Sequence, residues 1–229
     1  MHFPGETPAY RAARERLLDA ERDLRQDIEK VAAMRRELPL GGVIAQDYVF
    51  EEGAADLADS TTVRPVKLSD LFHSSGKLNT LVLYSFMYGP NMKQACVSCT
   101  SILDSLNGAS PHITQRVNLA VVAKSPIGRI RDFARGRDWN HLRLLSSAHN
   151  PYNRDYYGET AEGNQMPSLN VFVRRGGAIH HFYHTELLFG PTEPGQDARH
   201  VDLIWPLWNV FDFTPDGRGT DWYPKLAYT

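Results

Sequence analysis

The chain has 229 residues, enough to bury a substantial core either as one large domain or as one ordinary domain with additions. Its composition, 42% hydrophobic and 23% charged, is typical of a soluble globular protein and excludes the disordered, fibrous and membrane classes. A formal net charge of -2 gives no electrostatic reason to expect nucleic acid or an anionic membrane as a partner.

The sequence favours a cytoplasmic location. Its first residues lack the cationic segment and apolar run of a secretory signal. No apolar stretch approaches the roughly 20 residues that a membrane span needs. Two cysteines in so long a chain argue against a disulfide scaffold of the secreted type, so we expect a reducing compartment.

Residues 7–38 predict one long helix, because Thr7 is a good N-cap, Pro8 suits the first helical position and Pro39 ends the run. Apolar residues recur at every seventh position along it, namely Tyr10, Leu17, Leu24, Val31 and Leu38. At 1.5 Å per residue the helix would be about 45 Å long, longer than a small domain is wide. We therefore expect residues 1–40 to form a helical arm that packs along a second subunit, in a homo-oligomer such as a homodimer, or against a C-terminal extension. The alternative is a helix lying wholly on its own core.

The next part of the sequence changes to short strands and turns. Residues 47–50 predict a strand, and after a polar loop residues 64–72 predict a return strand that ends in a helical turn capped by Ser69. Residues 78–88, LNTLVLYSFMY, form the most apolar strand, suited to the centre of a sheet that is covered on both faces. A Gly-Pro pair ends this strand, and a helix begins near the two cysteines.

The rest of the chain alternates helices and strands. We expect helices over about residues 96–108, 126–137 and 200–212, and strands over residues 117–123, 142–145, 166–173 and 178–184. A long polar loop over residues 146–165 precedes the last two strands, and residues 174–177 predict their hairpin turn. This order predicts an α/β fold, in which a central mixed sheet with parallel inner strands and an antiparallel edge is flanked by helices.

Cys96 and Cys99 are the only cysteines, and two residues separate them. Cys96 follows the buried strand at or near the first turn of the next helix, where unpaired N–H groups and the helix dipole stabilise a thiolate. Such a position lowers a cysteine pKa from about 8.5 into the range of about 3.5–7.5. Cys99 lies one turn later on the same helical face and can close a disulfide. We predict that Cys96 attacks and that Cys99 resolves the resulting mixed disulfide.

Two other interpretations of the cysteine pair remain open. A zinc site needs two further ligands, and the obvious donors are His180, His181 and His184. On a regular strand these would alternate faces, and the two that share a face, His180 and His184, would lie about 13 Å apart, so we expect no metal. The pair is also compatible with two buried, unreactive cysteines packed under the sheet.

Met166-Pro167 supports the redox interpretation. The strand that follows would lie beside the strand carrying the cysteines, which puts its first residues next to the dithiol. Proline has no N–H, is tolerated at the first position of a strand and can be preceded there by a cis peptide bond. We predict that Pro167 shapes the substrate groove; a strand-start proline without a function is the alternative.

Nine segments in this order resemble the thioredoxin-fold superfamily and, more narrowly, the uncharacterised bacterial thioredoxin-like proteins grouped as domain of unknown function 899. They are RRELPL, DYVF, KLSDLF, YSFMYGP, CVSC, AVVAKSPIGRI, LLSS, MPSLNVFVR and FDFTPDGRG. The resemblance implies a thioredoxin-like domain over residues 41–190, with the helical arm before it and an aromatic C-terminal extension, residues 191–229, packed on the same domain. It implies no established reaction, because the family is uncharacterised.

The residues around the cysteines differ from those of better-known relatives. Thioredoxins have Trp before the first cysteine and Gly-Pro between the two, whereas Ala95 and Val97-Ser98 stand at those positions here. Peroxiredoxins have Thr or Ser three residues before the peroxidatic cysteine and Pro four residues before that, where this chain has Lys93 and Gly89. These differences disfavour a peroxidase of the usual kind. Lys93 either adds positive charge near the thiolate or is solvated.

The C-terminal aromatic residues and the polar loop before the last two strands are two further groups of interest. The C-terminal aromatic residues are Trp205, Trp208, Phe211, Phe213, Trp222 and Tyr223. We expect them to pack against the N-terminal helix as core or dimer interface, and the alternative is that they line a pocket or cover the dithiol. In the long polar loop we expect Asn153, Asp155 and Tyr156 to be solvated, and the alternative is that they approach the cysteines.

The leading hypothesis is therefore a cytoplasmic thiol–disulfide oxidoreductase that uses Cys96, Cys99 and Pro167 and needs no cofactor or metal. Its partners would be thiols and disulfides of proteins or small molecules, and neither nucleic acid nor a membrane. One alternative is a thiol peroxidase in which Cys99 resolves a sulfenic acid on Cys96. The other is a redox-inert module that associates through its long helix.

Overall fold

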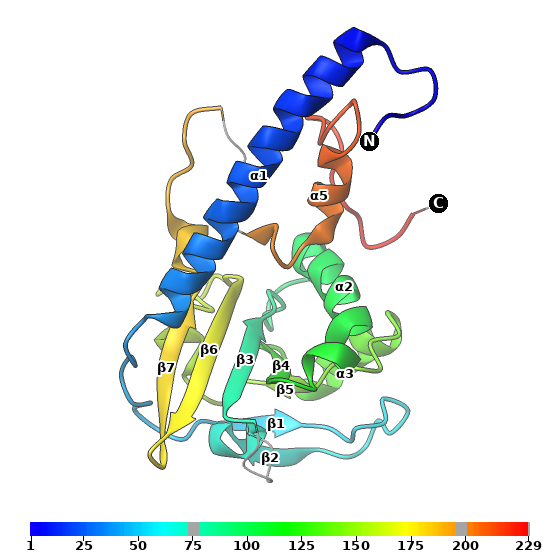
Figure 1. The fold of residues 1–229 in the computed structure, drawn as a ribbon. Coiled ribbons are helices and arrows are strands. Elements are labelled where there is room, and N and C mark those ends of the chain that lie inside the picture. The colour runs from blue at the N-terminus through cyan, green and yellow to red at the C-terminus, as the bar shows by residue number, and fades with distance from the viewer. Residues whose placement is uncertain (73–77, 196–200, 229) are drawn as a thin grey trace. The chain divides into compact units, whose positions relative to one another are not determined.

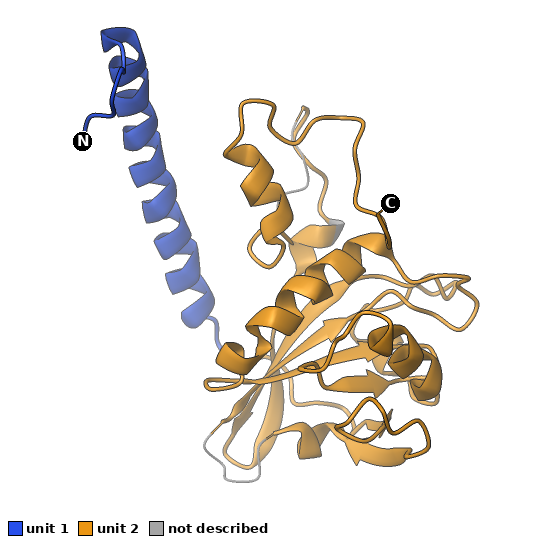
Figure 2. Cartoon of the chain, turned by 90° about the vertical axis from the view of Figure 1, so that its right-hand side faces the viewer, with its two compact units in different colours: residues 1–40 blue, residues 41–229 orange. Residues whose placement is uncertain are grey.

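The structure is a computed structural model that describes residues 1–72, 78–195 and 201–228. It divides into two compact units, Met1–Leu40 and Gly41–Thr229 (Figure 2). The first unit holds one long helix, and the second holds the sheet and the remaining helices. The expected extension over residues 191–229 includes residues 196–200 and 229, which lie outside the described part of the chain.

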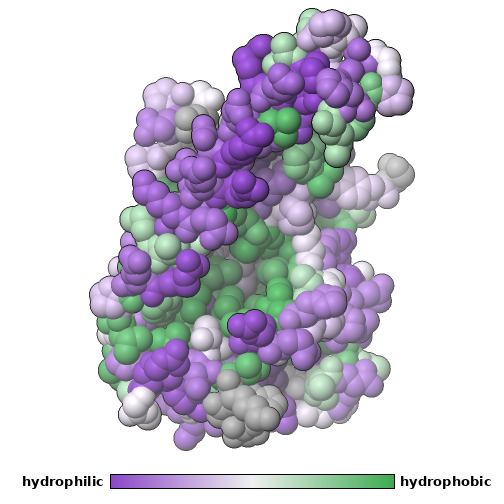
Figure 3. All heavy atoms as spheres, viewed as in Figure 1, coloured by the Kyte–Doolittle hydropathy of each residue, from purple (hydrophilic) through white to green (hydrophobic). Residues whose placement is uncertain are grey.

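Helix α1 (Pro8–Arg36) begins where the sequence predicts. The Thr7 hydroxyl accepts a hydrogen bond from the Tyr10 backbone N–H at 3.1 Å, and Pro8 occupies the first helical position. The helix ends two residues before the predicted end. The structure describes every residue of α1, and none of them is buried. Its side seen in Figure 3 is mainly hydrophilic, with scattered apolar residues.

The strands of the second unit form one mixed sheet. They are β1 (Val49–Glu52), β2 (Arg64–Lys67), β3 (Thr80–Ser85), β4 (Asn118–Ala123), β5 (Leu144–Ser146), β6 (Ser168–Arg175) and β7 (Ala178–His184). Among the described residues the order is β2-β1-β5-β4-β3-β6-β7 (Figure 1). Strands β3, β4 and β5 are mutually parallel and the outer strands are antiparallel. The predicted mixed sheet with parallel inner strands is therefore confirmed.

The second unit also holds helices and short helical turns. They are α2 (Val97–Ile113), α3 (Ile127–Arg135), α4 (Tyr152–Asp155), α5 (Pro206–Asp212), and the 3-10 turns η1 (Leu68–Leu71) and η2 (Glu186–Phe189). The last helix starts at Pro206, and residue 200 of its predicted range lies outside the described residues.

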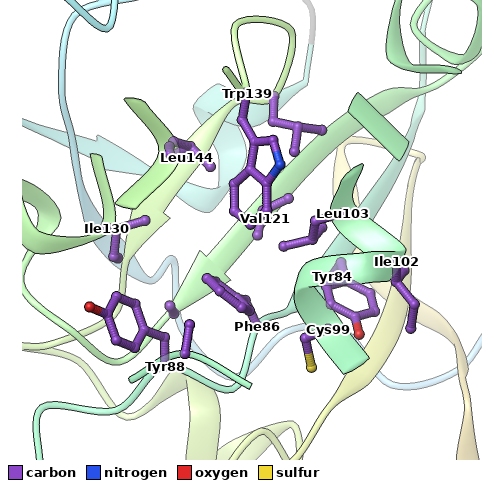
Figure 4. Close-up of a cluster of buried hydrophobic side chains, with 14 of the residues drawn as sticks. Tyr84, Phe86, Tyr88, Cys99, Ile102, Leu103, Val121, Ile130, Trp139 and Leu144 are labelled. Atoms are coloured by element: carbon purple, nitrogen blue, oxygen red, sulfur yellow. The ribbon is translucent and has the colours of Figure 1, made fainter. Parts of the chain in front are cut away.

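Apolar side chains form a buried cluster on each face of the sheet. On one face, residues of α2 and α3 such as Leu103 and Ile130 pack with Trp139 and Phe86 (Figure 4). The other face buries a second cluster around Phe172. Two buried faces explain why β3 carries consecutive apolar residues, Leu81 to Tyr84, rather than alternating apolar and polar ones.

The helix after the cysteines is longer than predicted. It continues past Asn107 and Gly108 to Ile113. Two polar side chains near the predicted end, those of Asn107 and Ser110, form hydrogen bonds to the backbone of His141. The Asn107 amide oxygen accepts from the His141 backbone N–H at 3.0 Å, and the Ser110 hydroxyl donates to the His141 carbonyl at 2.8 Å. With their side chains engaged in tertiary contacts, these residues do not compete for the backbone of their own helix.

The predicted cap at Ser69 is wrong. The cap of the turn after β2 is Lys67, two residues earlier, and the Ser69 hydroxyl instead donates to the Asp47 carboxylate at 2.7 Å. Ser69 therefore ties the turn to the chain segment that leads into β1.

Strands β6 and β7 form the predicted hairpin, with Gly176 and Gly177 both in the left-handed region, at φ 58° and 83°. The strict alternation assumed for β7 is wrong, however. Val171 pairs with Tyr183 while Phe172 pairs with His181, so Phe182 is the extra residue of a β-bulge. Because of this bulge, His181 and His184 line the same cavity.

Candidate active site

A short loop fixes the position of Cys96. After β3 the chain turns back, and the Cys96 backbone N–H donates to the Met87 carbonyl at 3.1 Å. The guanidinium of Arg129, on α3, donates to the carbonyls of Gly89 and Pro90 at 3.0 and 3.2 Å. The loop that connects the central strand to α2 is thus hydrogen-bonded at both ends.

Cys96 is the N-cap of α2, as the sequence predicts, and is half-buried. The two cysteines lie 3.7 Å apart. A hydrogen bond from the Cys99 thiol is the largest cause that lowers the pKa of Cys96 to about 6, although burial opposes the shift. The backbone N–H groups of Cys99 and Ser98 and the Ser98 hydroxyl also donate to the Cys96 sulfur. Cys96 therefore carries a negative charge at neutral pH.

Cys99 keeps its proton. It is buried, 1% exposed, and its hydrogen bond to Cys96, followed by burial, raises its pKa well above the usual range. Its side chain is also hydrogen-bonded to that of Tyr84, which lies beside it in the buried cluster (Figure 4). The pair is thus asymmetric, with an anionic, partly accessible sulfur at Cys96 and a neutral, enclosed thiol at Cys99.

The C-terminal extension contacts the first turns of α2. The Trp205 indole N–H donates to the Ser101 hydroxyl at 2.9 Å, and the Tyr223 and Ser98 hydroxyl oxygens lie 2.7 Å apart. Ser98 therefore contacts both the Cys96 sulfur and the extension.

Four aromatic residues of the extension line a cavity of about 440 Å³. They are Trp205, Trp208, Trp222 and Tyr223. These four residues thus line a pocket, which is the alternative expectation for the aromatic cluster. Packing of the cluster against the N-terminal helix stays a prediction. Phe213, expected in the cluster, is 86% exposed.

Pro167 comes directly before β6, the neighbour of β3. Ser168 pairs with Ser85, the last residue of β3, so Pro167 lies at the edge of the sheet from which the chain leads to Cys96. The Met166–Pro167 peptide bond is trans. The adjacency of the two strands is as the sequence predicts, and the role of Pro167 in a substrate groove stays a prediction.

The long polar loop is folded more tightly than predicted. Asn153, expected to be solvated, is 1% exposed. Its amide oxygen accepts from the Ser147 hydroxyl at 2.7 Å, and its amide nitrogen donates to the Gln165 side chain at 3.3 Å. Tyr156 is half-buried, and the exposed Asp155 accepts from the Tyr48 hydroxyl at 2.8 Å. Pro151 before Tyr152-Asn153 is a helix-start signal that indicates this structure in the sequence.

Two other predicted features concern metal and membrane. Within residues 1–72, 78–195 and 201–228, no group of three or more His, Cys, Asp or Glu side chains is arranged to hold a metal ion. In the same part of the chain, no helix combines the length and apolar character that crossing a membrane requires. Lys93 is exposed.

A mixed sheet whose central strand leads into a helix capped by the first cysteine of a Cys-x-x-Cys defines a protein of the thioredoxin-like fold. The predicted fold class is therefore confirmed. The chain belongs to the family described as bacterial protein of unknown function (DUF899), whose model matches residues 2–228. The predicted family is confirmed over almost the whole chain.

Several solved structures are similar to this chain. A thioredoxin peroxidase I of Plasmodium yoelii has 18% sequence identity and a TM-score of 0.47, with 75% of this chain and 90% of that chain covered. AhpC of Enterococcus faecalis has 10% identity and a TM-score of 0.47, with 73% and 90% covered. A mutant of Xanthomonas campestris peroxiredoxin Q has 14% identity and a TM-score of 0.47, with 74% and 96% covered. No curated protein matches the chain.

Proposed function

We propose that the protein is a thiol–disulfide oxidoreductase in which Cys96 is the attacking cysteine and Cys99 the resolving one. The observation that supports this most strongly is the hydrogen bond from the Cys99 thiol to Cys96, which, with the N–H groups at the start of α2, lowers the pKa of Cys96 to about 6. At neutral pH most Cys96 is then thiolate, the form that attacks disulfides.

The proposed reaction has two exchange steps. The Cys96 thiolate attacks one sulfur of a substrate disulfide, so that a Cys96–substrate disulfide forms and the other substrate sulfur leaves as a thiolate. Cys99 then loses its proton to solvent and attacks the Cys96 sulfur, which forms the Cys96–Cys99 disulfide and releases the second substrate thiolate. Two electrons pass from the dithiol to the substrate, and an external thiol reductant returns them.

The surroundings of the dithiol support a role in substrate binding. Pro167 directly precedes the strand beside β3 and has no N–H to offer the sulfurs, which agrees with its proposed place in a substrate groove. Tyr223, which lines the aromatic cavity, is hydrogen-bonded to the Ser98 hydroxyl, and Ser98 in turn donates to the Cys96 sulfur. We assign the substrate-binding role to residues 41–190 together with the C-terminal extension.

The test of this function is a trapping experiment. In Cys99→Ser the second step is blocked, so the mixed disulfide on Cys96 should accumulate and be visible by mass spectrometry after incubation with oxidised glutathione. Cys96→Ser is the matched control and should form no adduct, because Cys99 is enclosed. A Cys99→Ser protein that traps nothing, with an ordinary pKa at Cys96, would contradict the proposal.

The same preparations separate the two alternatives. The rate at which the reduced protein consumes hydrogen peroxide is measured by stopped flow. A rate no faster than that of free cysteine rules out a thiol peroxidase. A Cys96→Ala/Cys99→Ala variant with full biological activity, combined with loss of activity on deletion of residues 7–38, would instead favour a redox-inert interaction module.

We also propose that α1 joins copies of this chain into a homo-oligomer. Its apolar residues at every seventh position support this, since a stripe of that period is typical of helices that pack along one another. Four residues of this stripe lie on α1 and the fifth, Leu38, follows its end; all five are at least 42% exposed.

A further inference from the structure

A second cavity, of about 760 Å³, opens on the face of the sheet opposite to α2. Its walls are aromatic and come from two parts of the chain. Tyr156 and Tyr157 follow α4, while His181 and His184 lie on β7. The bulge in β7 is what aligns the two imidazoles on one side of the strand. Cavities of this volume are in the range that holds small organic molecules.

The floor of the cavity is built from packed and hydrogen-bonded groups. Asn170 is fully buried, and its amide oxygen lies 3.0 Å from His181 Nε2. The Asn170 amide nitrogen donates to the Ser168 hydroxyl at 3.3 Å. The His181 ring also packs against Tyr156, with 5.3 Å between the ring centroids. These contacts fix the orientation of His181 and Tyr156 before any ligand binds.

Two carboxylates lie at the exposed side of the cavity. The Tyr48 hydroxyl donates to Asp155 and so orients that carboxylate. Glu186 lies close enough to the two histidines to raise the pKa of both, although burial outweighs it and the net pKa shift of each imidazole is downward. At neutral pH the imidazoles are therefore uncharged, and the described lining has two negative charges and no lysine or arginine.

Tyr157 supplies an independent indication of binding. It is a non-glycine residue with φ 54°, a left-handed conformation that is unfavourable for a tyrosine. This conformation holds a side chain that is 69% exposed against the cavity, where its ring centroid lies 6.1 Å from that of His184. Backbone strain that keeps an exposed aromatic ring beside a cavity is typical of ligand sites.

We propose that this cavity binds an organic ammonium ion. The faces of tyrosine rings attract a cation, and the two carboxylates supply the opposite charge at the opening. A neutral ligand of the same shape gains neither interaction, and an anion is repelled. The site lies across the sheet from the cysteines, so its occupancy does not depend on the proposed redox function.

Isothermal titration of the full chain with matched probes tests this site. The probes are choline and benzylamine, each compared with the neutral compound in which carbon or a hydroxyl replaces the charged group. At least one cation should bind about tenfold more tightly than its neutral counterpart. If neither cation binds more tightly than its counterpart, the proposal is overturned.

Two variants locate the binding. Glu186→Gln should lower the affinity for the cation about three- to tenfold. Glu162 is an exposed carboxylate outside the cavity, so Glu162→Gln should leave that affinity unchanged. Tyr157→Gly removes the ring and accepts the left-handed backbone, so it should also weaken binding without loss of stability. Equal affinity in wild type, Glu186→Gln and Tyr157→Gly would overturn the assignment of the site. Cys96→Ala should bind the cation normally, which separates failure here from failure of the redox proposal.

Discussion

The hydroxyl oxygens of Tyr223 and Ser98 lie 2.7 Å apart, so the C-terminal extension reaches the helix turn that carries the reactive sulfur. Because Ser98 donates to Cys96, its own oxygen is free to accept a hydrogen bond from Tyr223. Hydrogen bonds arranged in a chain polarise one another. We therefore expect Tyr223 to stabilise the Cys96 thiolate indirectly.

Tyr223→Phe should raise the pKa of Cys96 by a fraction of a unit, and Ser98→Ala should raise it further, because it removes the donor itself. The pH dependence of the alkylation rate by iodoacetamide measures both. Tyr228→Phe removes another hydroxyl of the extension, one that accepts from the Lys225 backbone, and should leave the pKa of Cys96 unchanged. A Tyr223→Phe curve that superimposes on wild type would show that the contact has no electrostatic effect.

The Cys99 thiol should set the working pH of the protein. Wild-type alkylation should rise with pH to a plateau, with a midpoint near the Cys96 pKa of about 6. In Cys99→Ala the largest stabilising hydrogen bond is lost, and the midpoint should move upward by about one unit or more. An unchanged midpoint in that variant would mean that the helix start alone stabilises the thiolate.

The stripe on α1 should control assembly. Leu17 and Leu24 are 52% and 60% exposed, and replacing both with glutamate puts charge into any helix-to-helix contact. Size-exclusion chromatography with light scattering should show an oligomer for wild type and a monomer for the double variant. Gln26→Glu, which adds a charge outside the stripe, should stay oligomeric. Wild type that elutes as a monomer at micromolar concentration would refute the proposed oligomer.

Arg131 should contribute strongly to stability. It is 5% exposed, and its guanidinium donates to the backbone carbonyls of Ala54, Asp56 and Asp59 at 2.5, 2.8 and 2.7 Å. Arg131→Met leaves these carbonyls without their donor and should lower the free energy of unfolding by about 3 kcal/mol in urea denaturation. The exposed control Arg116→Met should change it by less than about 0.5 kcal/mol.

The histidines of the second cavity should make stability depend on pH. Burial lowers the pKa of both His181 and His184, so the unfolded chain binds protons at a higher pH than the folded chain does. Stability should therefore be complete above the usual histidine pKa of about 6.5 and decrease as the pH falls below it. Urea denaturation at a series of pH values should show a shallower acid decrease in His181→Gln/His184→Gln. A variant with the same pH slope as wild type would exclude these two groups as the cause.

Much of the fold is predictable from the sequence because its signals are local. The cap at Thr7, the run of apolar residues in β3 and the Gly176-Gly177 turn each encode their structure within a few residues. The position of Cys96 at the start of α2 belongs to the same class, since a Gly-Pro break precedes it and an apolar helix follows.

The remaining features depend on residues far apart in the chain. The burial of Asn153 requires one partner just after β5 and another before β6, and Tyr223 lies 125 residues from Ser98. A one-residue bulge leaves no mark in the HHFYH segment, yet it decides which histidines share a face. Side-chain partners at long sequence separation are set by packing, which composition and periodicity do not report.

Because the two sulfurs differ in burial, their reactivity reports whether the protein is folded. A bulky thiol reagent should react with one cysteine in the native reduced protein and with two after denaturation, because in the folded protein Cys96 is partly accessible and Cys99 is buried. The appearance of the second group then follows the opening of α2 from the sheet in real time. The chain thus needs no added label for its unfolding rate to be read.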